Sequence, residues 1–297
     1  MKKILFVSVD IVGSTDYKQR LKYSENWEEP FFYLYYEFKE KILKDTDFKF
    51  WKSIGDEITF YYQLVDEKQL VENFTKFLKN FLSEKESCHI NFFELGLKST
   101  FFVGYFNEID TILDENITKI KGAVYSQERS LKATFNSQTI EEAQKDYKDL
   151  KEVDITPMVV YFKKLKNISE DYKLEKDVDF IGPHIDIGFR ISKDSDAYLS
   201  VLSIELSEYL LKTIENHKVN LFYLGLKKYK GLNFDYPVFA TKAIDFQRNH
   251  LFSQYILMNY DLLYPRITTK TAHLYLEFIK EFRKRCGDYE YIELKFD

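Results

Sequence analysis

Two aspartates lie where apolar segments meet turns. Asp10 ends the apolar run of residues 4–9, and Asp56 lies in the turn of an aromatic-rich hairpin. A carboxylate at the end of a buried strand is costly unless it is paired or binds a cation. Two such groups, brought together from neighbouring strands, can hold two hard divalent ions through oxygen ligands. Such a pair supports phosphoryl chemistry, in which one ion activates a hydroxyl and the other neutralises phosphate charge.

Each aspartate also has a plainer interpretation. Asp10 could cap the helix that follows it, and Asp56 could belong to an ordinary Gly-Asp turn. The pair taken together, more than either residue alone, favours a metal site. Gly13, Ser14 and Thr15 follow the first aspartate and open a helix, where backbone N–H groups can receive a phosphate.

The segments around both aspartates resemble the metal motifs of class III adenylate and guanylate cyclases. Residues 6–15 (FVSVDIVGST) look like the first motif, and residues 52–56 (KSIGD) are similar to the second, a Lys-x-x-Gly-Asp hairpin. The resemblance implies that Asp10 and Asp56 bind two divalent cations, Mn²⁺ or Mg²⁺, with help from the Ile11 carbonyl. It also implies that Lys52 contacts the base of a nucleoside triphosphate.

Residues 179–190 (DFIGPHIDIGFR) resemble the cyclase signature Asp-x-x-Gly-x-x-Val-Asn-x-Ala-x-Arg. By that resemblance, Asp179 reads the base and Arg190 stabilises charge on the triphosphate, a task suited to a guanidinium with its fixed fork of donors. A surface salt bridge is the plainer role for Arg190. Asp186 stands where the family has Asn, and an ionised Asp cannot donate to a ribose oxygen. His184 is expected to begin a helix near a dimer interface.

A Gly-Phe pair at residues 188–189 replaces two small residues of that signature, which is a second departure from the family. The fourth motif is residues 227–237, which are similar to a Leu-Lys-Gly strand of the same family. The resemblance implies that Lys230 contacts the phosphates. Lys227 and Lys228 compete for this role, and a solvated basic strand edge is the plainer interpretation.

The four motifs occur in the order in which the family has them. Family members are head-to-tail dimers with the active site at the interface, so the resemblance implies a homodimer with two sites. One chain would supply Asp10 and Asp56. The other would supply the remaining groups, namely Lys52, Asp179, Asp186, Arg190 and Lys230. The implied reaction closes a nucleoside triphosphate into a 3′,5′-cyclic monophosphate and releases pyrophosphate.

The base is less well indicated than the reaction. Lys52 and Asp179 are the pair found in adenylate cyclases, which favours ATP. Residues 182–190 look more like the pyrimidine cyclases of bacterial anti-phage (Pycsar) systems, which favours UTP or CTP. Strand alternation places Phe50 on the face of Lys52 and Trp51 on the other. Phe50 would then fill the space of a purine ring, although a core position is its plainer interpretation.

Composition excludes several other classes of protein. The chain has 297 residues and a net charge of -5, which disfavours a nucleic-acid-binding surface. Its two cysteines are far apart, so we expect neither a disulfide nor a zinc site but a cytoplasmic protein. The N-terminal apolar run is too short for a signal peptide, and no segment approaches the length of a membrane helix.

The predicted elements form an α+β fold. A strand at 3–12, a helix at 27–43, a hairpin at 48–64, a helix at 70–82 and a strand at 95–106 give the βαββαβ order of a ferredoxin-like core. Further predictions are a helix at 197–218, strands at 221–230 and 237–243, and helices within 246–285. We therefore expect a class III cyclase core at 1–244 with an insertion at 107–178, followed by a helical C-terminal extension at 245–297.

Two other functions remain open from the sequence. A catalytically silent cyclase homologue would bind nucleotide without turning it over, and the Asp186 and Phe189 departures are its support. A palm-like nucleotidyl transferase also places paired aspartates on a ferredoxin-like sheet, but the Arg190 motif argues against it. The reaction product distinguishes the three, since they give a cyclic monophosphate, nothing and an oligonucleotide respectively.

Overall fold

The computed structural model describes residues 2–21, 28–91, 95–106, 110–113, 179–242 and 262–286. These residues belong to two units that are considered separately. The smaller unit is an antiparallel pair of strands, β5 (Thr111–Leu113) and β6 (Asp179–Ile181). Most of the predicted insertion at 107–178, and the predicted boundary at 244/245, lie outside the described residues.

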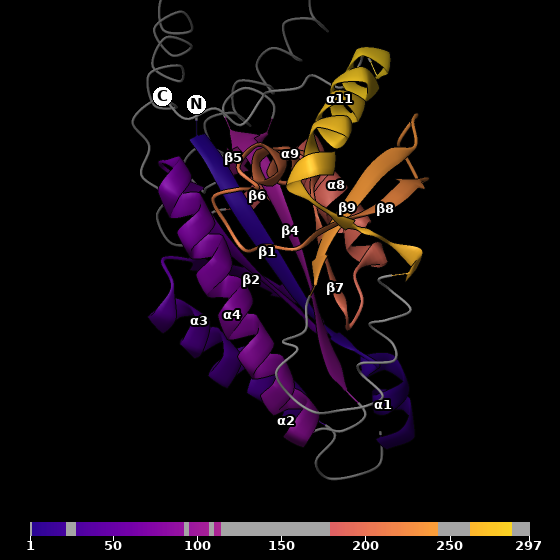
Figure 1. Cartoon of the computed structure of the whole chain (residues 1–297). Helices are drawn as coiled ribbons and strands as arrows, with labels where there is room; N and C mark the ends of the chain where they lie inside the picture. The colour runs from indigo at the N-terminus through magenta and orange to yellow at the C-terminus, as the bar shows by residue number, and fades with distance from the viewer. Residues whose placement is uncertain are drawn as a thin grey trace, which may run out of the picture. The chain divides into compact units, whose positions relative to one another are not determined.

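The first half of the larger unit is a four-stranded antiparallel ferredoxin-like sheet (Figure 1). Its strands lie in the order β4-β1-β3-β2, which confirms the predicted α+β core. The strand bounds are β1 Lys2–Val12, β2 Lys49–Ile54, β3 Glu57–Leu64 and β4 Gly96–Phe106. Because β1 is central and β3 is its neighbour, the segments that carry both predicted metal ligands lie beside each other.

Four more strands extend this sheet to eight, in the order β10-β8-β9-β7-β4-β1-β3-β2. β7 pairs parallel with β4, and the other new pairings are antiparallel. The bounds are β7 Leu199–Leu202, β8 Leu221–Lys227, β9 Tyr236–Lys242 and β10 Arg266–Ile267. The strand predicted at 221–230 therefore ends three residues early, and the basic segment after it is a loop.

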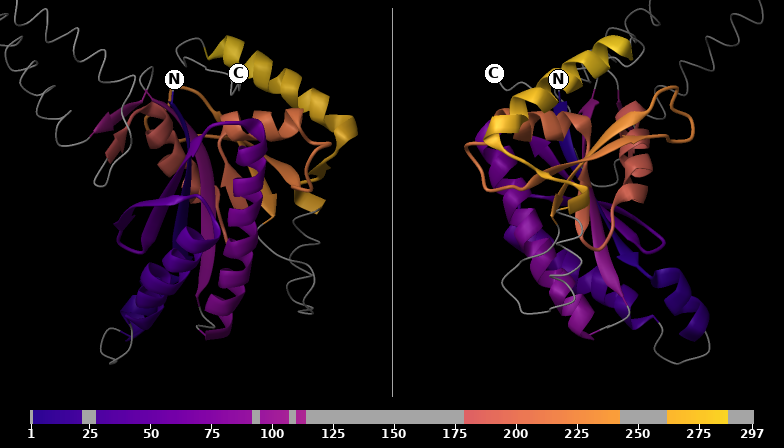
Figure 2. Two further views of the ribbon diagram at one scale, coloured as in Figure 1. Left: turned by 90° about the vertical axis from the view of Figure 1, so that its left-hand side faces the viewer. Right: turned by 45° about the vertical axis from the view of Figure 1, so that its right-hand side comes forward.

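Helices cover both faces of the sheet (Figure 2). Between β1 and β2 lie α1 (Ser14–Leu21), α2 (Glu29–Tyr33), the π-helix η1 (Leu34–Phe38) and α3 (Lys39–Asp45). The predicted helix at 27–43 is thus present, with Pro30 in its first turn and a π-helical turn in its middle. The other helices in the described ranges are α4 (Glu67–Asn91), α8 (Pro183–Ile191), the 3₁₀ turn η2 (Ser192–Asp194), α9 (Ile204–Lys212) and α11 (Thr269–Arg285).

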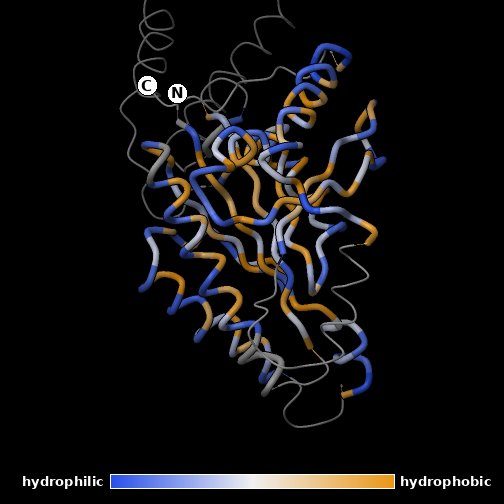
Figure 3. The backbone as a smooth tube through the Cα atoms, viewed as in Figure 1, coloured by the Kyte–Doolittle hydropathy of each residue, from blue (hydrophilic) through white to orange (hydrophobic). Residues whose placement is uncertain are grey.

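The hydrophobic core is built largely from aromatic rings. On the face covered by α3 and α4, Phe38 and Phe77 pack edge-on against Phe60. On the opposite face, next to α8, Phe6 stacks on Phe102 at a centroid distance of 5.2 Å. Figure 3 shows hydrophobic residues concentrated on the central strands, whereas α1 is mainly hydrophilic. The high aromatic content of the chain therefore serves two packed layers.

The helix predicted at 197–218 is wrong in its first part. Residues 199–202 form β7, all four of them buried, and α9 begins only at Ile204. A short, wholly apolar run fits a buried strand and a helix equally well by periodicity. Residues 199–202 form a strand because they pair with β4 on one side and with β9 on the other. Ser203 then donates its backbone N–H to the Phe101 carbonyl at 2.8 Å.

The described part of the C-terminal extension combines a strand and a helix. β10 pairs with β8 at one edge of the sheet. α11 packs against α9, and Arg283 of α11 contacts Glu208 of α9 at 2.6 Å. No helix in the described ranges combines the length and apolarity needed to cross a membrane.

Candidate active site

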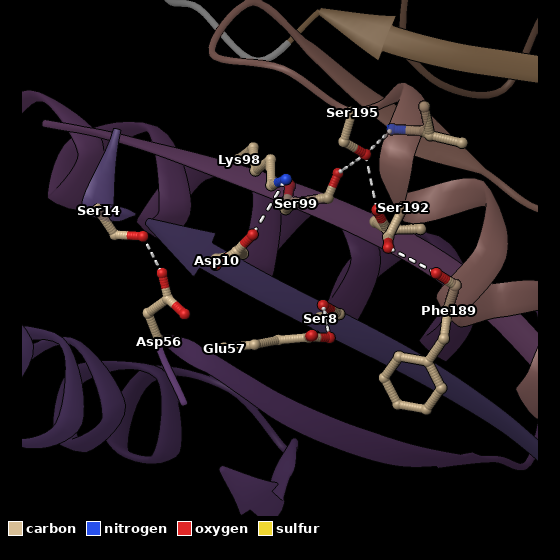
Figure 4. A network of polar contacts seen from close by, with 12 residues as sticks. Ser8, Asp10, Ser14, Asp56, Glu57, Lys98, Ser99, Phe189, Ser192 and Ser195 are labelled. Atoms are coloured by element: carbon tan, nitrogen blue, oxygen red, sulfur yellow. Dashed lines mark hydrogen bonds and ion pairs between the residues drawn. The ribbon is translucent and has the colours of Figure 1, made fainter. Parts of the chain in front are cut away.

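The register of three strands places charged side chains in a row across one face of the sheet. Asp10 of β1 lies opposite Glu57 of β3 and opposite Lys98 of β4. The Lys98 ammonium lies 3.0 Å from Asp10 Oδ2. Glu57 accepts a hydrogen bond from Ser8, which is two residues before Asp10 and therefore on the same face. Figure 4 shows these side chains coming from three neighbouring strands.

The pKa values of the Asp10 and Glu57 carboxyl groups are both raised, mainly by burial. Burial raises the pKa of Asp10, the hydrogen bond and charge of Lys98 lower it, and the charge of Asp56 raises it; the net pKa is above the usual value. The pKa of Glu57 is also raised, first by burial and further by the charges of Asp10 and Asp56. Concentrated negative charge on this face is therefore only partly neutralised by Lys98.

Asp56 is held beside the start of α1. Ser14, the first residue of that helix, donates its hydroxyl to Asp56 Oδ2, and the Lys18 ammonium lies 3.7 Å from the same oxygen. The Tyr35 hydroxyl donates to the carbonyl of Gly55, which has a positive φ of 64° in the hairpin turn. The turn that carries Asp56 is thus anchored to the helical segment between β1 and β2.

Gly13, Ser14 and Thr15 form the link from β1 to α1. Gly13 has a φ of 84°, which ends the strand and turns the chain into the helix. Ser14 is buried and Thr15 is exposed. The predicted phosphate-binding segment therefore lies next to Asp56, at the end of the strand that carries Asp10.

The donor atoms here suit hard cations. Asp10 and Asp56 supply carboxylate oxygens close enough for the charge of one to act on the other. Ile11 is buried, and its backbone hydrogen-bonds the Asp10 carboxylate. Among the described residues, no group of three or more His, Cys, Asp or Glu side chains is arranged to hold a metal ion. The predicted ligand set needs only two carboxylates and a backbone carbonyl, so the metal assignment stays a prediction.

The expected alternation of β2 is wrong because the strand contains an irregularity. Phe50 pairs with Phe60, but Lys52 pairs with Thr59, so the register shifts between them. Such a bulge inserts one extra residue and reverses the alternation beyond it. Phe50 packs on Phe60, on the face of α3 and α4. Lys52 lies on the opposite face, which Thr59 shares with Ser8 and Asp10.

Trp51, not Phe50, is the aromatic neighbour of Lys52. The Trp51 ring packs against Phe6 and Phe189, and the Lys52 ammonium lies 4.0 Å from its centroid. This arrangement removes the geometric reason for assigning Phe50 to a base pocket. Lys52 stays on the same face of the sheet as Asp10, opposite Thr59. Its predicted contact with a base is untested.

Helix α8 packs closely on β4 because it contains a glycine. A Cβ at Gly188 would lie 2.3 Å from the nearest ring atom of Phe102. Phe189, the next residue, places its ring 5.7 Å from Phe102 and 6.1 Å from Trp51. Gly188 and Phe189, which differ from the cyclase signature, therefore pack against the large aromatic side chains of Phe102 and Trp51.

The first turn of α8 is fixed by a buried carboxylate. Asp110 Oδ2 accepts a hydrogen bond from the Tyr105 backbone and lies 2.9 Å from His184 Nδ1, while Oδ1 accepts from the His184 backbone. A Cβ at Gly182 would clash with Asp110 at 2.1 Å. His184 lies in the first turn of the helix, one residue after its start at Pro183, and its side chain is buried in this network.

The third and fourth motifs meet at the end of α8. Arg190 donates a hydrogen bond to the backbone carbonyl of Lys230. A Cβ at Gly231 would lie 3.3 Å from the Arg190 guanidinium. The Lys230 side chain is exposed, whereas the Lys227 ammonium lies 3.7 Å from Asp194. Asp186 is exposed on α8, and Asp179 belongs to the smaller unit, so its relation to Lys52 stays a prediction.

Sequence reasoning missed Glu57, Lys98 and Asp110. Glu57 directly follows Asp56, and its position opposite Asp10 could have been found by aligning the hairpin with β1. Lys98 is the one charged residue of β4, which is a visible signal. Asp110 lies near the start of the predicted insertion at 107–178, and no motif in the sequence marks it.

The fold resembles that of solved nucleotide cyclases, although no family model and no curated protein matches the sequence. The adenylyl cyclase CyaB from P. aeruginosa is 13% identical, with a TM-score of 0.51 over 84% of this chain and 97% of that chain. The guanylate cyclase domain of RhGC from Catenaria anguillulae is 10% identical with a TM-score of 0.46, over 82% of this chain and 98% of that one. The guanylyl cyclase Cya2 is 12% identical with a TM-score of 0.45, over 83% and 95% respectively.

The similarity to CyaB covers 84% of this chain and 97% of that chain. At this identity it establishes architecture, while the chemistry must be argued from the site. The chain therefore has the class III nucleotide cyclase fold.

Proposed function

We propose that this protein is a nucleotide cyclase that converts a nucleoside triphosphate into a 3′,5′-cyclic monophosphate and pyrophosphate. The observation that carries the proposal is the placement of Asp10 and Asp56 at one end of adjoining strands, beside the start of α1. The fold, shared with an adenylyl cyclase, supports the same reaction. The reaction class is in-line attack of the ribose 3′-oxygen on the α-phosphorus.

Each residue has a defined task in this proposal. Asp10 and Asp56, with the Ile11 carbonyl, would hold two divalent cations, Mg²⁺ or Mn²⁺. Bound there, the cations would lower the pKa of the attacking hydroxyl and offset triphosphate charge. The backbone N–H groups at Gly13, Ser14 and Thr15 would orient phosphate oxygens.

A homodimer with two sites at its interface completes the proposal. Arg190 would donate to the triphosphate oxygens as charge develops, and Lys230 would contact the phosphates. Lys52 and Asp179 would bind the base, and Asp186 would lie near the ribose. These groups would come from the second copy, so each site would need both chains.

We further propose UTP or CTP as the substrate and a second-messenger role in anti-phage defence. Both proposals are supported by the resemblance of residues 182–190 to the pyrimidine cyclases of bacterial anti-phage systems. Trp51 and Phe189 add bulk beside Lys52, which suits a small base. ATP is the competing substrate, since the structural neighbour CyaB is an adenylyl cyclase.

The test is to incubate the protein separately with ATP, GTP, CTP and UTP in the presence of Mn²⁺ and to identify the products by mass spectrometry. We expect a cyclic monophosphate and pyrophosphate from a pyrimidine triphosphate. Asp10→Ala should abolish turnover with the fold intact, whereas Asp45→Ala, an exposed carboxylate on α3, should not change it. An oligonucleotide product, or no product from any triphosphate, would contradict the proposal.

A further inference from the structure

A lysine occupies the carboxylate that is proposed to bind a cation. Lys98 is the cross-strand partner of Asp10 in the β1–β4 ladder, and its ammonium lies 3.0 Å from Asp10 Oδ2. The ladder runs the full length of both strands, so the backbone fixes which residues face each other. Both side chains are partly buried, with exposed fractions of 26% and 27%. The contact is therefore set by register, unlike a chance meeting of two flexible surface side chains.

The ammonium and a divalent cation compete for the same carboxylate. A carboxylate can bind a cation with either oxygen, but positive charges that share one carboxylate repel each other strongly when water is partly excluded. A cation at Asp10 must therefore share the carboxylate with Lys98 or move the ammonium away. Lys98 has a flexible four-carbon stem, so it can withdraw without movement of β4.

A second carboxylate gives the withdrawn ammonium a partner in the same row. Glu57 lies on the far side of Asp10, and the charge of Lys98 already acts on it. Movement of the ammonium toward Glu57 would keep it paired while Asp10 binds a cation. Glu57 is itself held by Ser8, so it is already on the correct face.

We propose that Lys98 is an internal counter-ion that competes with divalent cations for Asp10 and so weakens their binding. This inference rests on the cation site proposed above. Its consequence is that the free protein binds Mn²⁺ or Mg²⁺ weakly, and that the cations bind well only with a triphosphate, whose negative charge compensates Lys98.

Mn²⁺ binding to the full-length protein, measured by isothermal titration calorimetry without nucleotide, tests this. Lys98→Gln should tighten Mn²⁺ binding about tenfold, which corresponds to about 1.4 kcal/mol. Lys98→Arg keeps the charge and should retain wild-type affinity. Lys212→Gln is the matched control, because it breaks a Lys–Glu ion pair of 2.9 Å on α9 and should leave Mn²⁺ affinity unchanged. Unchanged or weaker binding by Lys98→Gln would overturn the inference.

Two further measurements separate the possible failures. Asp10→Ala should lose Mn²⁺ binding; if it binds as the wild type does, the proposed cation site itself is wrong, whatever Lys98 does. If Lys98→Gln does not fold, the ¹³Cε signal of Lys98 in the wild-type protein decides, assigned by its absence in Lys98→Arg. That signal should shift during a Mg²⁺ titration, and a signal that stays fixed while Mg²⁺ binds contradicts displacement.

Discussion

Arg190 on α8 donates a hydrogen bond to the backbone carbonyl of Lys230, a residue 40 positions further along the chain. The guanidinium is therefore positioned by backbone and does not depend on another flexible side chain. Gly231 permits this approach, since its φ is 86° and a Cβ there would press on the guanidinium. The arrangement leaves further N–H donors of the guanidinium available for a phosphate.

Arg190→Ala should lower kcat on the order of 10²–10³-fold with a smaller effect on KM, because the donor acts mainly on charge that develops in the transition state. Arg190→Lys keeps the charge but loses the fork, so most of the loss should persist. Steady-state kinetics with the preferred triphosphate measures both. A change in KM alone would assign Arg190 to ground-state binding instead.

Gly188→Ala should destabilise the protein by about 1–3 kcal/mol, the usual range for overpacking a core. The added methyl group would meet the Phe102 ring, and this outweighs the helix propensity that alanine gains. Urea unfolding measures the change. Gly96→Ala is the control, because a Cβ there would make only ordinary contacts at 3.7 and 3.8 Å. Equal effects of the two substitutions would refute the close packing of α8.

Lys85 predicts an unusual pH dependence of stability. Burial lowers the pKa of Lys85 to about 7, against the opposing charge of Asp196. The unfolded chain then binds this proton more tightly than the native state between about pH 7 and the ordinary Lys pKa near 10.4. Stability from this group therefore increases as pH rises through that interval. Lys85→Met should be more stable than wild type at pH 6.5, and chemical denaturation should show the difference shrinking toward pH 10.

The His184–Asp110 contact predicts the opposite trend. Burial lowers the pKa of His184, but its hydrogen bond with Asp110 and the charges of Glu205 and Asp110 raise it by more, so the net pKa is raised. The stabilisation is complete below about pH 6.5, the unfolded value, and is lost as pH rises through the higher native pKa. Asp110→Asn should flatten this dependence in unfolding curves measured from pH 5 to 9. A wild-type stability that is constant over this range would argue against the charged pair.

The first half of the fold was predictable because its signals are local. Apolar runs, a Gly-Asp turn and an amphipathic helix gave β1 to β4 in the correct order. The resemblance to cyclase motifs added the function of Asp10 and Asp56 as a prediction. β7 was missed because four apolar residues carry no period of their own, and only pairing with two neighbouring strands fixes their conformation.

The site was less predictable than the fold. Which residues face Asp10 depends on strand register, and register is a property of the assembled sheet. Glu57 and Lys98 were therefore missed, although both are charged residues in strands that were themselves predicted. The face of Phe50 was wrong for a related reason, since regular alternation was assumed across a strand whose register shifts between Phe50 and Lys52.

The irregularity between Phe50 and Lys52 adds Trp51 to β2 as an extra residue, while the residues on either side of it keep consecutive partners on β3. Deleting Trp51 would restore regular pairing with Phe50 opposite Phe60 and Lys52 opposite Thr59, so both side chains would stay on their present faces. The extra residue in β2 thus decides whether an aromatic ring lies beside the lysine, whereas the partner residues on β3 decide which face of the sheet the lysine takes.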